Sequence, residues 1–290
     1  MLDRPFLKRL QRSLLVALVL IGYSAQLHAD IAPLPIRFLI TFDDGPSGSR
    51  FTNPTKQILD VLDQNTIQPG IKAIFFLETR STSRGGTDAG RLLMYREYTD
   101  GHLLAFHTST PYHSNHRFMT PEALDLSLQD GVDDLTSVSG VAPQLVRPPF
   151  WNYDARTLDS YHRHGMQMLL TDLSARDGII WGINWSWHKH NDLLEGLRLA
   201  KAEWISGKMP SFDGTTPIVV TFHDVNRRTA RNIEAYLKIL LQVAGELNMP
   251  VAAKPFYDNR ADLENAAMVR TVRNMGEAPH LPGIWNWLWK

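Results

Sequence analysis

The feature that most constrains the fold is a series of short apolar runs, each followed at once by polar or charged residues. The first run, residues 36–42, leads into Asp43 and Asp44, and the run at 103–106 leads into His107. Short continuous apolar runs are typical of strands buried on both faces, as in a parallel sheet. We expect about seven such strands, at 36–42, 71–77, 103–106, 144–146, 166–170, 217–222 and 250–253.

The segments between these runs carry helical patterns. Leu124, Leu128, Val132 and Leu135 recur at helical spacing after residues 120–124. Further helices are expected at 54–64, 191–206 and 228–247. Strands that alternate with helices, without any internal repeat, predict one α/β domain. We expect a deformed or truncated (β/α) barrel of about seven parallel strands.

The N-terminal residues 1–29 have the layout of a secretory signal peptide, which leaves residues 30–290 as the mature domain. Basic residues precede an apolar core at 14–23, and Ala25 and Ala29 are candidates for the cleavage site. That core is shorter than the roughly 20 apolar residues that span a bilayer. We therefore expect an exported protein, periplasmic or extracellular, without stable membrane insertion. An N-terminal membrane anchor is the alternative.

The overall composition excludes several classes of protein. Hydrophobic residues make up 43% of the chain and charged residues 21%, as in an ordinary globular protein. Lys plus Arg and Asp plus Glu number 30 each, so no excess charge points to nucleic acid. Cysteine is absent, so neither disulfides nor a lipid attached to cysteine can contribute. The oligomeric state remains open.

Polar side chains with catalytic potential stand at or just after the carboxyl ends of several predicted strands. These residues are Asp43, Asp44, His107, Arg147, Asp177 and His223. In parallel barrels the active site is built at that end of the strands. Taken singly, each residue has a structural explanation: an Asp-Asp-Gly-Pro sequence is commonly a turn. Taken together, they predict an active site.

The residue types in this set favour metal-assisted hydrolysis. An aspartate with two histidines suits Zn²⁺ or another first-row divalent ion and leaves positions open for water and substrate. Such an ion acidifies its water and polarises a carbonyl group, as hydrolysis of an amide or ester requires. A second carboxylate can act as general base, and a histidine on another strand can protonate the leaving group.

The same residues resemble the sequence motifs of the polysaccharide deacetylase family, also called the NodB homology domain or carbohydrate esterase family 4. The string "TFDDGP" at 41–46 matches the first motif of that family. The third, fourth and fifth motifs are similar to "RPPF" at 147–150, "DLSARD" at 172–177 and "VVTFHD" at 219–224. The resemblance implies a truncated (β/α) barrel and metal-dependent removal of acetyl groups from polysaccharides.

The family also implies a role for each matching residue. Asp43 would be the general base and Arg147 its partner, while His223 would be the general acid, oriented by Asp177. Asp44 would bind the metal. The backbone N–H near Phe150 would help to stabilise the oxyanion of the tetrahedral intermediate.

The second motif is the least regular, because the stretch 107–116 contains three histidines. The family pattern begins at His107 and places its second histidine four residues later, where this chain has Pro111. Counting back from the helix start at 120–122, the simplest alignment inserts two residues and gives His113 the role of second histidine ligand. His116 is the alternative, and loss of the metal site is a third possibility.

Two departures from the family pattern concern the wall of the substrate site. Phe150 replaces the usual tyrosine of the third motif, and Gly178 replaces the usual tryptophan after Asp177. Trp151, or else Trp181, would then fill the space, and we count Phe150 and Trp151 among the substrate-binding residues. The C-terminal residues Trp285, Trp287 and Trp289 are expected either to pack on the domain or to stack on sugar rings.

The sequence thus predicts a metal-dependent hydrolase of carbon–nitrogen bonds that removes the N-acetyl group from a polysaccharide containing N-acetylglucosamine. One divalent ion is expected, Zn²⁺ by ligand type, with Co²⁺ and Ni²⁺ as alternatives. An O-acetyl esterase of the xylan type with the same site is the nearest alternative function. A catalytically inactive carbohydrate-binding protein is the alternative from another class.

Overall fold

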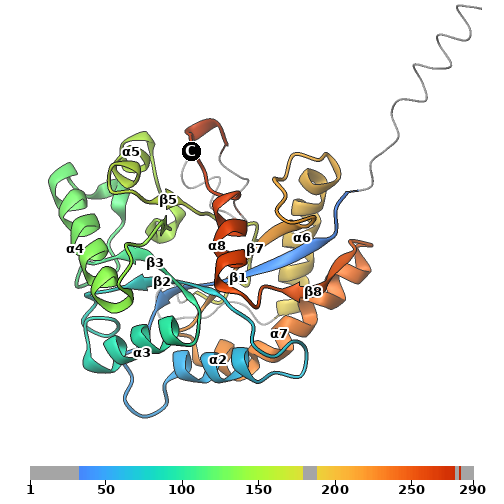
Figure 1. Cartoon of the computed structure of the whole chain (residues 1–290), viewed down its shortest axis with the longest axis horizontal. Helices are drawn as coiled ribbons and strands as arrows, with labels where there is room; N and C mark the ends of the chain where they lie inside the picture. Colours follow the sequence, from blue (N-terminus) through green and yellow to red (C-terminus); the bar gives the residue numbers. More distant parts are fainter. Residues whose placement is uncertain (1–32, 179–187, 278–280, 282–290) are drawn as a thin grey trace, which may run out of the picture. The chain divides into compact units, whose positions relative to one another are not determined.

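The structure, a computed structural model, describes residues 33–178, 188–277 and 281. A parallel sheet forms the centre of this part of the chain, and helices pack around it (Figure 1). Its strands are β1 (Ile36–Gly45), β2 (Ile74–Glu78), β3 (Leu103–Thr108), β4 (Leu145–Val146), β5 (Gln167–Met168), β6 (Leu173–Ser174), β7 (Thr216–His223) and β8 (Val251–Phe256).

The strand order confirms the predicted fold. Seven strands follow one another as β5-β4-β3-β2-β1-β7-β6, and β8 also pairs with β1. Every pair in this sheet is parallel. The path ends at β5 on one side and at β6 on the other, so the described residues form a truncated barrel, as predicted.

The helices lie where the apolar periodicity predicts them, and additional ones fill the remaining connections. They are α2 (Pro54–Asp63), α3 (Asp88–Thr99), α4 (Pro121–Ser139), α5 (Ala155–Arg163), α6 (Lys189–Ile205), α7 (Arg227–Glu246) and α8 (Arg260–Met268). The sequence analysis did not predict α3 or α8, whose hydrophobic stripes are weak, and it gave no range for α5 or for the two-residue strand β6. Local capping is strong: Asn53 and Thr120 accept hydrogen bonds from the first turns of α2 and α4, which both begin with proline.

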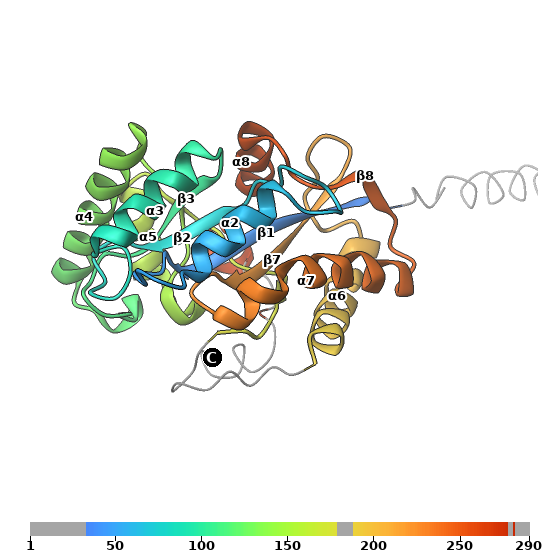
Figure 2. The same ribbon diagram turned by 90° about the horizontal axis from the view of Figure 1, so that it is seen from below.

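The sheet has two buried faces. Along β1, Phe38, Ile40 and Phe42 belong to the large core beneath the outer helices, whereas Leu39 belongs to a smaller core. That smaller core also contains Leu263 and other residues of α8. In Figure 2, α8 lies on one side of the central strands, and α6 and α7 lie on the other. Since side chains alternate along a strand, odd-numbered residues of β1 face the α8 side.

Several predictions fall outside the described residues: the signal segment 1–29, Trp181, and the tryptophans of the C-terminal tail. Among the helices of the described residues, none has the length and apolarity that crossing a membrane requires.

Candidate active site

The ends of five strands bring polar side chains together at one mouth of the sheet interior. The smaller, interior core contains Leu39, Phe76, Ala105, Leu145 and Val219. Two or four residues further along the same strands, and so on the same face, stand Asp43, Glu78, His107, Arg147 and His223. The pairing register agrees, because Asp43 is opposite His223 on β7 and opposite Phe76 on β2. The apolar residues therefore fill the interior, and the polar ones close its carboxyl end.

Asp43 is held by a fully buried arginine. The Nη1 of Arg147 donates to Asp43 Oδ1 at 2.7 Å and to Thr41 Oγ1 at 2.7 Å. The remaining donors of the guanidinium reach the carbonyl oxygens of Leu169, at 2.9 Å, and Leu170, at 3.0 Å. A charge-assisted contact of this kind stabilises and orients the Asp43 carboxylate. The carboxylate is thereby held in one orientation at the mouth.

Asp44 has a backbone conformation that brings it to the same mouth as Asp43. In a regular strand, neighbouring side chains point to opposite faces. Here Asp44 has a left-handed φ of 70°, and the pairing of β1 with β2 shifts register between Asp43 and Gly45. Aspartate tolerates this region better than most residues do. The irregularity lets two consecutive carboxylates serve one site.

Gly45 allows this turn to pack against a buried acid. A Cβ atom at position 45 would lie 2.3 Å from Asp224 Oδ2, which is too close for any side chain. That oxygen accepts a hydrogen bond from Thr55 Oγ1 at 2.6 Å. Burial raises the pKa of Asp224 to about 7. The glycine of the first motif and the aspartate of the fifth are therefore linked by packing.

Asp44, His107 and His113 form a cluster of possible metal ligands. One ligand atom from each lies within 4.8 Å of those of the other two. His107 Nε2 is 3.2 Å from Asp44 Oδ1, and His113 Nδ1 is 3.6 Å from the same oxygen. His107 donates through Nδ1 to the carbonyl oxygen of Arg147 at 2.7 Å, so its Nε2 keeps the lone pair that a metal needs.

The charge state of Asp44 also fits a cation. Burial alone would raise the pKa of Asp44, but His113, the hydrogen bond with His107, and the charges of His223 and Arg84 outweigh it and hold the pKa well below its usual range. An ionised carboxylate with two imidazoles matches the preference of Zn²⁺ and similar ions. The residues present therefore fit a divalent metal.

Glu78, at the end of β2, supports this cluster and was missed by the sequence analysis. Its side chain is 1% exposed, and its Oε1 accepts from His113 Nδ1 at 2.6 Å. Arg84 Nη1 donates to the same oxygen at 2.5 Å and to the backbone carbonyl of Asp44 at 2.7 Å. Glu78 thus fixes the ring of His113 through Nδ1.

Replacing Glu78 with glutamine is expected to weaken metal binding by about 10- to 100-fold, because the carboxylate no longer orients and polarises His113. Competition with a chromophoric chelator measures the affinity without reference to activity. Glu122→Gln, an exposed change in the first turn of α4, is the matched control. An affinity equal to that of the control would show that Glu78 has no such role.

His116 lies away from the cluster, inside the protein. It is fully buried, its Nδ1 pairs with the hydroxyl of Tyr161 at 2.9 Å, and its ring stacks on Phe106 with centroids 6.0 Å apart. Burial lowers the pKa of His116 to about 3, so the ring is neutral. Of the two candidates for the third ligand, the structure brings His113 and not His116 beside Asp44.

Asp177 and His223 form a second pair at the mouth. His223 Nδ1 donates to Asp177 Oδ1 at 2.8 Å, and Thr229 Oγ1 donates to Asp177 Oδ2 at 2.6 Å. Asn226 Nδ2 donates to the Asp177 carbonyl at 2.6 Å. Burial favours the neutral ring, but Asp177, with smaller contributions from Asp44 and Asp43, raises the pKa of His223 to about 9. His223 is therefore protonated at neutral pH and can give up a proton.

The two residues of the third motif that are predicted to bind substrate differ in exposure. Phe150 is 41% exposed, and its ring meets His113 edge-on with centroids 4.5 Å apart, so it lies at the rim. Trp151 is only 7% exposed and packs in the large core. Its burial leaves little of the ring accessible, and its role in substrate binding stays a prediction. Both residues have left-handed φ values, 60° and 52°.

Gly178 lies directly against the ring of His223. A Cβ atom at position 178 would be 3.1 Å from His223 Cε1 and 3.2 Å from Nε2, closer than ordinary contact. A larger residue here would press on the imidazole. Close packing against His223 therefore favours glycine at position 178 in this chain. The glycine also lacks the side chain with which a tryptophan would line the substrate site.

A model of the polysaccharide deacetylase family matches residues 34–169 of the chain. Over these residues the chain is similar to the polysaccharide deacetylase family. The match covers the deacetylase motifs at Asp43, Asp44, His107 and Arg147, whereas Asp177 and His223 lie beyond it. The resemblance inferred from the motifs is confirmed.

A curated chitin deacetylase from Pestalotiopsis sp. is 27% identical to the chain over 149 residues, which are 50% of this chain and 44% of that relative. The chain thus spans less than half of this deacetylase's length.

Solved deacetylase structures share the fold. The chitin deacetylase of Colletotrichum lindemuthianum superposes with a TM-score of 0.54 at 20% identity, over 77% of this chain and 88% of that one. The carbohydrate esterase family 4 domain of a xylanase from the hindgut metagenome of Trinervitermes trinervoides gives 0.54 at 17% identity, over 80% and 90%. At these identities the likeness establishes the fold alone.

Proposed function

We propose that the protein is an exported, metal-dependent N-deacetylase acting on a polysaccharide that contains N-acetylglucosamine. The observation that carries the proposal is the meeting of three units at one mouth: an Asp–Arg pair, a metal-ligand cluster and a His–Asp pair. Hydrolysis of an acetamide requires a base, an electrophile and an acid, and each unit supplies one of them.

The metal cluster supplies the electrophile. Asp44, His107 and His113 would hold one divalent ion, Zn²⁺ by ligand type or else Co²⁺ or Ni²⁺, which when bound acidifies water and polarises the acetyl carbonyl. Glu78 and Arg84 keep His113 and Asp44 in place for this task.

The two other units move protons. Asp43 removes a proton from the attacking water, and Arg147 stabilises the carboxylate in the orientation that accepts it. His223 donates its proton to the departing amine nitrogen, since an amine leaves far more readily than its anion. Asp177 fixes the ring and stabilises its charged form before transfer. The backbone N–H of Phe150 remains the proposed oxyanion donor.

The pH profile tests the role of His223. Because the pKa of His223 is raised to about 9, its imidazole carries the transferable proton below that pH and loses it above. We expect kcat on a chitin oligomer to fall about tenfold per pH unit above pH 9. Asp177→Asn removes the charge that raises the pKa, so the alkaline fall should begin at lower pH. An alkaline limb unchanged by Asp177→Asn would assign it to another group.

The alternatives differ in what they release and from which substrate. An O-acetyl esterase with the same site would release acetate from acetylated xylan and not from N-acetylglucosamine oligomers. An inactive carbohydrate-binding protein would release none. Acetate release should therefore be measured on chitin oligomers, peptidoglycan, poly-N-acetylglucosamine and acetylxylan, with and without a chelator. Release from amino-sugar substrates that stops with the chelator supports the proposal, and release from acetylxylan alone would overturn it.

A further inference from the structure

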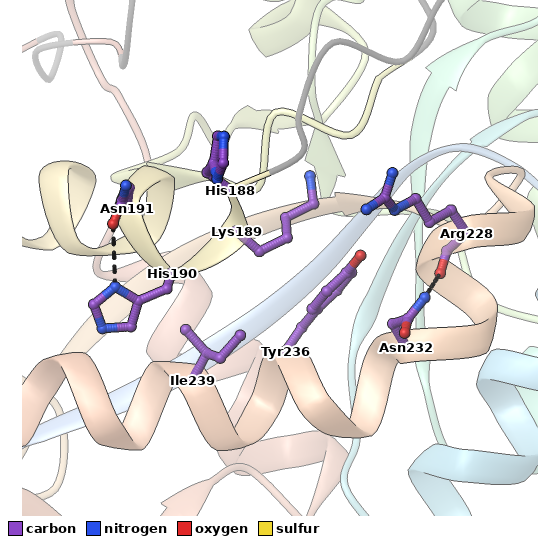
Figure 3. A pocket seen from close by; sticks show the side chains of 8 residues that line it. All are labelled: His188, Lys189, His190, Asn191, Arg228, Asn232, Tyr236 and Ile239. Carbon is purple, nitrogen blue, oxygen red and sulfur yellow. Dashed lines mark hydrogen bonds between the residues drawn. The ribbon is translucent and has the colours of Figure 1, made fainter.

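A separate cavity of about 380 Å³ lies between the start of α6 and the first four turns of α7 (Figure 3). Its volume is in the range of small-ligand sites. None of the eight residues that line it is acidic. They are His188, Lys189, His190, Asn191, Arg228, Asn232, Tyr236 and Ile239.

The charged groups of this cavity converge at one end. In Figure 3 the amino group of Lys189, the hydroxyl of Tyr236 and the guanidinium of Arg228 point to the same end of the cavity. Two cations and a phenol on one side, with no carboxylate in the lining, make this end a place for a negatively charged group.

Lys189 is unusual because it is charged and hardly exposed. The residue is 6% exposed, its ammonium donates to the carbonyl oxygen of Ala175, and it lies 5.7 Å from the ring centroid of Tyr236. Burial lowers the pKa of Lys189, against the attraction of Asp177 and Asp192. An ammonium has three donors, and an anion in the cavity would offset part of its lost hydration.

The cavity adjoins the acid side of the candidate active site. Lys189 bonds the backbone of Ala175, two residues before Asp177. Arg228 is followed directly by Thr229, whose hydroxyl donates to Asp177 Oδ2 at 2.6 Å. Both cations are thus close to the residues that hold Asp177, which in turn holds His223.

We propose that this cavity is an anionic subsite that binds a carboxylate carried by a sugar near the acetylated residue of the polymer. The proposal rests on the deacetylase function above and narrows its substrate to acidic glycans. Lys189 and Arg228 bind the carboxylate, and Tyr236 donates a hydrogen bond to it. Asn191 and Asn232 offer further polar contacts to the sugar ring.

Matched substrates test this subsite. Oligomers of alternating N-acetylglucosamine and N-acetylmuramic acid, with free lactyl carboxylates, are compared with the same oligomers after conversion of the carboxylates to methylamides. A third set carries uronic acids in place of the lactyl groups and identifies which carboxylate fits. We expect kcat/KM to be about tenfold higher for one of the acidic sets than for the methylamides, and the advantage to shrink with added salt.

Arg228→Gln removes one cation of the subsite, and Arg231→Gln, on the same helix but outside the lining, is the matched control. Arg228→Gln should lower kcat/KM on the preferred acidic oligomer about tenfold and change it less than twofold on the methylamide. Arg231→Gln should leave both nearly unchanged. An equal loss on both substrates, or an equal effect of Arg231→Gln, would overturn the subsite.

A binding measurement separates this proposal from the deacetylase function. The enzymatically inert probe is the acidic oligomer without any acetyl groups, titrated calorimetrically into the full-length protein. Binding about tenfold weaker in Arg228→Gln supports the subsite even if no glycan yields acetate, in which case the proposed function alone fails. Acetate release from chitin oligomers together with no difference in this titration would overturn the subsite and leave the deacetylase function standing.

Discussion

Asp43→Asn is expected to lower kcat for acetate release by about 10²–10⁴-fold while leaving one metal ion bound. The amide keeps the size of the side chain and can still accept from Arg147 Nη1, but it cannot take a proton from water. Acetate is measured with a coupled assay on a chitin oligomer, and metal by elemental analysis of the same sample.

The control variant is Asp63→Asn, which makes the same chemical change at the exposed last residue of α2. It should match the parent protein in activity, metal content and thermal stability. If Asp43→Asn retains more than a tenth of the parent activity, the base is another group. If it loses the metal as well, Asp43 acts as a ligand, and the division of labour between the two aspartates is wrong.

His113→Ala is expected to weaken metal binding by more than a hundredfold and to abolish acetate release. The change removes a ligand outright, and loss of an orienting partner alone commonly costs 10- to 100-fold. It also removes the imidazole that lies between Glu78 and Asp44. The purified variant should therefore contain no stoichiometric metal, and added zinc should restore activity only at high concentration.

His116→Ala is the informative partner of this experiment. His116 is buried between Phe106 and Tyr161, so the smaller side chain leaves a cavity and should lower the free energy of unfolding by about 2–4 kcal/mol. Metal content and kcat should stay close to those of the parent at temperatures where the variant is folded. Loss of metal in folded His116→Ala, with metal retained in His113→Ala, would reverse the assignment.

Much of the fold could be predicted because parallel strands that are buried on both faces have continuous apolar sequences. The runs at 36–42 and 217–222 became β1 and β7, and their final polar residues, Asp43 and His223, lie opposite each other in the register. Strand β6 escaped prediction because it has only two residues, and a pattern that short has no measurable period.

The parts of the site that escaped prediction depend on geometry that residue types do not encode. Glu78 ends the apolar run of β2 and looks like an ordinary strand end, yet it lies two residues after Phe76 on the interior face. This spacing of two residues from an interior position was the sequence signal that could have identified Glu78. Asp44 reaches the mouth only through its left-handed backbone, and Trp151 turns into the core, which no spacing rule foresees.

The buried position of Arg147 limits how this protein can be redesigned. Its guanidinium hydrogen-bonds both Asp43 on β1 and the backbone that follows β5. Arg147 therefore stabilises the truncated barrel as well as orienting the proposed base. A substitution of Arg147 would therefore lower the stability of the barrel together with the activity. A directed-evolution library should leave this arginine fixed and vary residues at the rim around Phe150 and in the cavity around Arg228, where specificity can change without weakening the barrel.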